Sequence, residues 1–122
     1  MTNEEWIYQV VDSFYQKARH DVLIGYHFRN IKDFDHHIPR IAAFWDLQLL
    51  GSTKKTLHAP FDLFNLHNVL GLKRGELGRW MVLFKQSLEH ELELHPEFEA
   101  MGVLWNERLN FFQVKFSRLF GI

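Results

Sequence analysis

Apolar side chains recur every three or four residues along most of this chain, which is the spacing that places them on one face of an α-helix. Three prolines and seven glycines separate the segments that carry this pattern. No segment alternates polar and apolar residues as a half-buried strand does, so we expect an all-α protein, with residues 1–122 forming one domain. The pattern predicts helices at residues 2–18, 37–50, 60–71, 73–94 and 96–119.

Prolines and capping residues indicate where the predicted helices begin. Thr2 and Glu5 have the spacing of a capping box, in which each side chain binds a free backbone N–H of the first turn. Pro39 is tolerated only in the first turn of a helix, so we expect the second helix to begin at or just before His37. The inward face of the last helix, which Pro96 starts, is expected to carry Trp105, Leu109, Phe112, Phe116 and Leu119.

Composition and charge narrow the classes of function. Fourteen basic and fifteen acidic residues leave a formal charge of −1 and form no basic stripe, which argues against nucleic acid as a partner. The chain has no cysteine, no secretory pattern at its N-terminus and no apolar run of the roughly 20 residues that cross a bilayer. We therefore expect a cytoplasmic protein without disulfides and without a membrane partner. The sequence does not determine its oligomeric state.

The eight histidines prompt a search for metal sites. Neither the paired histidines of a zinc protease nor the glutamate–histidine spacing of a di-iron bundle occurs, so a non-haem metal site is not expected. Four histidines lie among charged or polar residues and are expected at the surface: His20, His27, His90 and His95.

His67 differs from these because its surroundings, residues 63–70, are almost wholly apolar. In a helix it would share one face with Leu70, and such a histidine is either a hydrogen-bonded core residue or the ligand of a group that fills the core. Aromatic residues make up 16% of the chain, and twelve of them are phenylalanine. This share favours either a crowded core or a core built around a flat apolar guest.

Several short motifs occur in a fixed order over nearly the whole chain: residues 14–21, 24–28, His37 with Ile41 and Phe44-Trp45, 49–51, 67–72 and Arg79-Trp80. By the order and spacing of these motifs, the sequence resembles the truncated haemoglobins and, within them, the group III branch. The Gly-Gly pairs typical of groups I and II are absent, which suits that branch. The resemblance implies a two-over-two helical sandwich around haem b, iron protoporphyrin IX.

The resemblance assigns roles to individual residues. His67 matches the proximal ligand of the haem iron, and Phe28 matches the phenylalanine that stacks on the porphyrin. The positions that match the distal side, where a gas binds, are Tyr15, His37 and Trp80. The remaining haem contacts that the resemblance implies are Ile41, which forms the apolar ceiling, with Phe44, Trp45 and Leu70.

Each of these residues also has a purely structural interpretation. Tyr15, Phe28 and Trp80 could be ordinary core aromatic residues, and His37 could be a surface histidine beside His36. For His37 the two interpretations remain equally open.

The connector before His67 departs from the family pattern, because it is longer than in group III relatives and contains a second histidine. That residue, His58, is an alternative proximal ligand or a neighbour of a haem propionate. Further basic residues that could pair with the propionates are Lys54, Lys55 and Arg74.

A ferrous haem held by one imidazole leaves its opposite axial position open for a diatomic gas. The Tyr15 hydroxyl and the Trp80 indole N–H are suitable donors to bound O₂. We therefore expect reversible O₂ binding with high affinity and slow release, with NO, CO and cyanide as further ligands. One alternative is a haem enzyme, an NO dioxygenase or a peroxidase, that needs a separate reductase. Another is a haem-free regulator that keeps the helical fold.

Overall fold

The computed structural model describes residues 1–29, 34–52 and 71–122. No strand occurs in these parts of the chain, which confirms the predicted all-α class. The other residues include His58, His67, Leu70 and most of the helix predicted at residues 60–71, and they lie outside the description. None of the described helices is long and apolar enough to cross a membrane. The helices are α1 (Asn3–Ala18), η1 (Gly25–Phe28), α2 (Phe34–Leu50), α4 (Arg74–Leu94), η2 (Pro96–Phe98) and α5 (Glu99–Phe120), of which η1 and η2 are short 3-10 helices.

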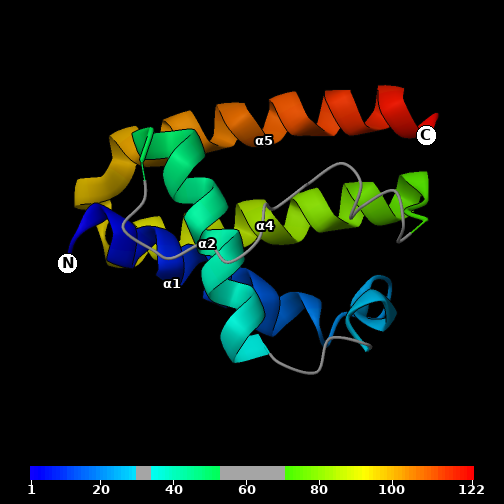
Figure 1. Ribbon diagram of the computed structural model, residues 1–122, viewed down its shortest axis with the longest axis horizontal. Coiled ribbons are helices and arrows are strands. Elements are labelled where there is room, and N and C mark those ends of the chain that lie inside the picture. The colour runs from blue at the N-terminus through cyan, green and yellow to red at the C-terminus, as the bar shows by residue number, and fades with distance from the viewer. Residues whose placement is uncertain (30–33, 53–70) are drawn as a thin grey trace.

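The helices pack as two crossed pairs. α4 and α5 lie side by side and run in opposite directions, joined by η2 (Figure 1). α1 packs against α2 and α4, and α5 packs against α4 and α2. The pair of α1 with α2 therefore lies across the pair of α4 with α5. This arrangement agrees with the two-over-two sandwich expected from the sequence.

Large aromatic side chains fill the space between the helices. The Trp6 ring stacks on Phe98 at 4.9 Å and meets the Trp105 ring edge-on at 5.9 Å, measured between ring centroids. Trp105 also lies 5.4 Å from Trp45. Each such pair contributes about 0.5–1.5 kcal/mol beyond the burial of its area, so these rings hold helix to helix. All four tryptophans of the chain are buried, one on each α-helix: Trp6, Trp45, Trp80 and Trp105.

The helix starts match the expected ones in part. The Thr2 hydroxyl accepts the backbone N–H of Glu5 at 3.1 Å, which is one of the two hydrogen bonds of the predicted capping box. α2, however, begins at Phe34, so the prediction of a start at or just before His37 was wrong. Pro39 lies in the second turn of the helix, where its missing N–H costs one backbone hydrogen bond. Burial of the neighbouring apolar residues Ile38 and Ile41 offsets that loss.

The last helix also departs from its prediction at both ends. Pro96 starts the 3-10 turn η2, and the α-helix itself begins at Glu99. Four of the five residues expected on the inward face are buried, but Leu119 is 59% exposed. The prediction for Leu119 was wrong because the covered side of the last turn lies toward Phe120, whose ring stacks on Phe116 at 5.3 Å.

Gly25 follows the turn after α1, and we expect its replacement by alanine to destabilise the protein. A Cβ atom there would lie 3.0 Å from the backbone oxygen of Arg19, which cannot move without distorting the end of α1. The overpacked Gly25→Ala variant should lose about 1–3 kcal/mol of unfolding free energy, measured by urea titration with circular dichroism.

Gly78→Ala is the matched control, because a Cβ atom at this position inside α4 meets nothing within 4 Å. It should gain about 0.5–1 kcal/mol, since alanine favours the helix over glycine. A Gly25→Ala variant as stable as the unmodified protein would contradict the expected clash.

Candidate functional site

An apolar cavity of about 50 Å³ lies between α1, α2, α4 and α5. Its lining includes five residues of the predicted site: Tyr15, Ile41, Phe44, Trp45 and Trp80. The other lining residues are Phe14, Met81, Phe84, Leu109, Phe112 and Phe116. Most of the predicted site residues that the structure describes therefore surround one cavity.

Phe28 and His37 do not belong to this lining but contact residues that do. The Tyr15 ring meets the His37 ring at 5.5 Å and the Phe28 ring at 5.6 Å, both edge-on. Phe28 in turn lies 5.2 Å from Trp80. Tyr15 comes from α1, His37 from α2 and Trp80 from α4, so three helices bring these residues together, with Tyr15 in contact with His37 and Phe28 in contact with Tyr15 and Trp80.

Tyr15 is a hydrogen-bond donor at any ordinary pH. Its residue is only 5% exposed, and this burial raises the pKa of the phenol well above its usual value of 10.0. The hydroxyl therefore keeps its proton and does not become a phenolate beside the cavity.

His37 lies at the edge of the site and is half-buried. Burial lowers the pKa of its imidazole from the usual value of 6.5, and the positive charge of Arg40 lowers it further. At neutral pH the ring is therefore uncharged, with one nitrogen as donor and the other as acceptor. Its edge-on contact with Tyr15 shows that the ring is turned toward the predicted site.

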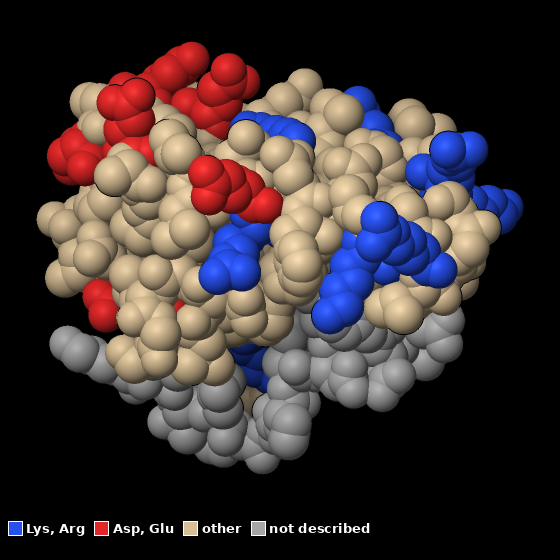
Figure 2. Space-filling view, turned by 90° about the horizontal axis from the view of Figure 1, so that it is seen from above, with Lys and Arg blue, Asp and Glu red and all other residues tan. Residues whose placement is uncertain are grey.

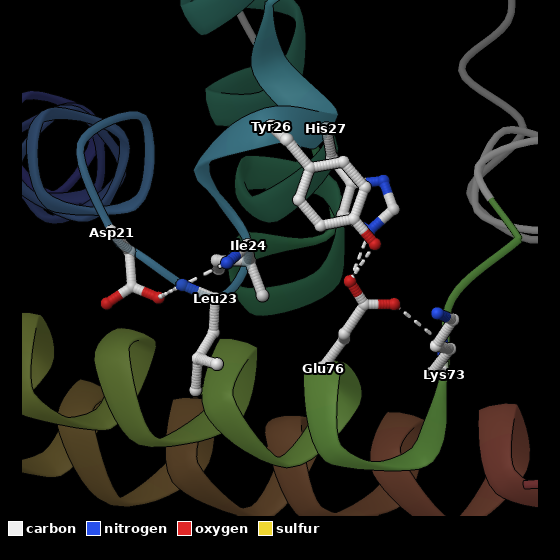
Figure 3. A network of polar contacts seen from close by, with 7 residues as sticks. All are labelled: Asp21, Leu23, Ile24, Tyr26, His27, Lys73 and Glu76. Atoms are coloured by element: carbon white, nitrogen blue, oxygen red, sulfur yellow. Dashed lines mark hydrogen bonds and ion pairs between the residues drawn. The ribbon is translucent and has the colours of Figure 1, made fainter.

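Glu76, near the start of α4, holds the η1 segment in place (Figure 3). One carboxylate oxygen accepts the Tyr26 hydroxyl and lies 3.0 Å from Nε2 of His27. The other oxygen accepts the backbone N–H of Lys73 at 3.0 Å. Burial opposes the ionisation of Glu76, but these bonds outweigh it and leave its pKa below the usual 4.5. The next residue after His27 is Phe28, so this network also positions Phe28 against Trp80.

A second polar contact joins the same segment to α4. Arg79 donates from Nε at 3.0 Å and from Nη2 at 2.7 Å to one carboxylate oxygen of Asp21. The hydrogen bond from Arg79 lowers the pKa of Asp21. The other oxygen of Asp21 accepts the backbone N–H groups of Leu23 and Ile24, as Figure 3 shows. Asp21 thus shapes the turn and binds it to the helix that carries Trp80.

The prediction that four histidines lie at the surface is correct in part. His20 and His90 are exposed, and the side chain of His95 is 33% exposed and lies 3.4 Å from Glu97. The surface prediction was wrong for His27, whose side chain is only 4% exposed. Polar sequence neighbours suggested the surface, whereas the partner that buries this ring, Glu76, lies 49 positions away. The acidic residue in the first turn of a predicted helix was the one signal that could have singled out Glu76.

Comparison with known proteins identifies the fold. The chain matches no protein-family model and no curated protein. It is similar in structure to the group III truncated hemoglobin from Campylobacter jejuni, with a TM-score of 0.75 and 23% sequence identity. The match covers 98% of this chain and 92% of that one. The chain therefore has the truncated globin fold, as the sequence motifs predict.

We expect His37 to make stability depend on pH. The unfolded chain binds a proton at His37 near pH 6.5, whereas the folded protein binds it only at lower pH. Acidification below pH 6.5 should therefore lower the unfolding free energy, by at most about 1.4 kcal/mol per pH unit from this residue. His37→Gln should remove this part of the loss, as measured by urea unfolding above and below pH 6.5.

His36→Gln is the control, because the same change at the exposed neighbour should leave the acid sensitivity intact. Equal pH dependence in the unmodified protein and in His37→Gln would show that His37 is not held in its neutral form.

Proposed function

We propose that this protein holds haem b in the cavity between α1, α2, α4 and α5 and reversibly binds O₂, with NO, CO and cyanide as further ligands. The position of Tyr15, His37 and Trp80 is the observation that carries the proposal. Groups that can donate hydrogen bonds meet from three helices beside an otherwise apolar, aromatic cavity. When bound, haem supplies a flat apolar disc and an iron with an open axial position for a diatomic gas.

The chemistry of the lining fits such a disc. Ile41, Phe44 and Trp45 present apolar surface from α2, and Phe84 and Phe112 present it from α4 and α5. The free volume of about 50 Å³ is smaller than the roughly 300–1,000 Å³ of most small-molecule sites. We therefore infer that haem enters by displacing side chains of the lining outward.

We propose His67 as the residue that holds the iron, with His58 as the alternative. The assignment rests on the family resemblance and on the apolar stretch around His67, since both histidines lie outside the described residues. A neutral imidazole suits this role, because it binds iron through one nitrogen and keeps the other free for a hydrogen bond.

Tyr15 and Trp80 are proposed to retain the gas. Burial keeps the Tyr15 phenol protonated, so its hydroxyl can donate a hydrogen bond, and the Trp80 indole N–H can only donate. A donor to a charged acceptor contributes about 1.5–3 kcal/mol, which corresponds to a roughly 10- to 100-fold slower release for each donor. Slow release suits oxygen scavenging or sensing better than bulk transport.

The iron ligand is tested by absorption spectroscopy of the protein purified with haem. We expect a Soret band that is lost in His67→Ala, because the variant has no imidazole at the proposed ligand position. His58→Ala is the matched control and should keep the band. Absence of the band from the unmodified protein would remove haem from the proposal, and its loss only in His58→Ala would move the ligand to residue 58.

The retention of the gas is tested by stopped-flow measurement of O₂ dissociation from the reduced protein. Tyr15→Phe and Trp80→Phe should each accelerate release roughly 10- to 100-fold, because each removes one donor. Tyr8→Phe makes the same change on α1 at a residue outside the cavity lining, and it should leave the rate unchanged. Rapid release that Tyr15→Phe does not accelerate is the result that excludes this role for Tyr15.

A further inference from the structure

The outer face of α5 carries apolar side chains that no described part of the chain covers. Phe111 is 51% exposed and Val114 is 52% exposed, while Phe112 and Phe116 point the other way into the core. Val82, on the neighbouring helix α4, is 46% exposed. Phe111 and Val114 lie about one turn apart, so together they leave apolar surface on this helix that is available to a partner.

Two charged residues flank Phe111 and Val114 at regular intervals. Glu107, Phe111, Val114 and Arg118 follow one another at steps of four, three and four residues, which places them along one line of the helix. This is the spacing of the contact seam in a coiled coil. We call these four residues the α5 seam. Along the helix the seam reads acidic, apolar, apolar, basic. When two copies lie antiparallel, the acidic residue of each copy therefore faces the basic residue of the other.

We propose that a second copy of this chain binds the α5 seam, with the two α5 helices antiparallel about a two-fold axis. Phe111 then packs against the partner's Val114, and Glu107 pairs with the partner's Arg118. The two-fold axis repeats each contact with the subunits exchanged, as in most closed dimers. A parallel pairing would set Glu107 against the partner's Glu107 and Arg118 against the partner's Arg118, and this repulsion disfavours it.

The charges of this face support a self-complementary contact. Within the described part of the chain, Glu107 and Arg118 are both exposed and make no ion pair or hydrogen bond. Figure 2 shows acidic side chains gathered where α5 begins and basic ones toward its C-terminal end. Two such faces attract each other when they meet in opposite directions, because each acidic end then meets a basic end.

Phe111 is held in position before a partner arrives. Its ring lies 5.5 Å from Phe112, and the Lys115 ammonium lies 5.6 Å from its centroid. An ordered side chain loses little further freedom on binding, which favours association. The seam is nevertheless short, so we expect a small interface and a reversible dimer of the weak class.

The proposed dimer leaves the candidate haem cavity uncovered. α5 lines the cavity with Leu109, Phe112 and Phe116, which lie on the side of the helix opposite the seam. The proposal therefore does not depend on haem binding, and it can be tested on the protein with or without haem.

Analytical ultracentrifugation over a range of concentrations tests the proposal with charge reversals. We expect the unmodified protein to dimerise, and Glu107→Lys and Arg118→Glu each to raise the dissociation constant at least about tenfold, since each puts like charges at both ends of the seam. An equimolar mixture of the two single variants should form a heterodimer again, because at both ends a basic side chain of one variant then faces an acidic side chain of the other. The double variant should recover the homodimer for the same reason.

Lys17→Glu is the matched control, a charge reversal at an exposed residue of α1 outside the seam, and it should leave the dissociation constant unchanged. Circular dichroism checks that each variant keeps its helices. A protein that stays monomeric at every concentration overturns the proposal. A dimer that neither single variant weakens also overturns the proposal. A mixture of the two single variants that fails to associate overturns it as well.

Discussion

The packing of large aromatic rings between crossing helices is the constraint on which the rest of this structure depends. The Trp45 ring of α2 lies 5.6 Å from the Phe84 ring of α4 and 5.8 Å from the Phe112 ring of α5, measured between ring centroids. One side chain therefore joins three helices. The Phe14 ring of α1 joins this group by packing against the Phe84 ring, with 4.7 Å between the two ring centroids. These rings also line the cavity. The core and the candidate site are therefore built from the same contacts, and a change in one alters the other.

Polar contacts restrict η1, a part of the site that does not belong to a long helix. Phe28 lies in η1, a four-residue 3-10 helix whose own hydrogen bonds restrain it less than those of an α-helix would. Glu76 and Asp21 supply the missing restraint, because their contacts join the residues around η1 to α4. Both carboxylates are fully bonded, so their burial does not leave a charge without a partner. Phe28 is thereby fixed against Trp80.

The two faces of α5 have separate roles in this account. The inward face contributes apolar rings to the cavity, and the outward face carries the α5 seam. Because the two faces point in opposite directions, the proposed association through the seam and the proposed binding in the cavity can vary independently. A change on the outer face is thus free to alter assembly without altering the surroundings of Tyr15 and Trp80.

The failures of sequence-based prediction have a common cause. Pro39 in the second turn of α2, exposed Leu119 and buried His27 all depend on residues that pack against them from elsewhere in the chain. Local rules describe the intrinsic preference of a segment, and tertiary contacts override them where burial or a distant partner contributes more. Five of the residues to which the family motifs assigned roles line the cavity, whereas the motifs assigned no role to the other lining residues.

The sequence by itself determined the positions of the four long helices that the structure describes and the apolar side of most of their turns, because both follow from the 3.6-residue period of neighbouring side chains. It also determined that Thr2 caps α1, since donor and acceptor lie three residues apart. Only the tertiary structure decided that Glu76 binds Tyr26 and His27. It also decided that Tyr15 contacts His37 and that Phe28 packs between Tyr15 and Trp80. These partners lie on different elements, and no local spacing relates them, so their contacts exist only once the helices have packed.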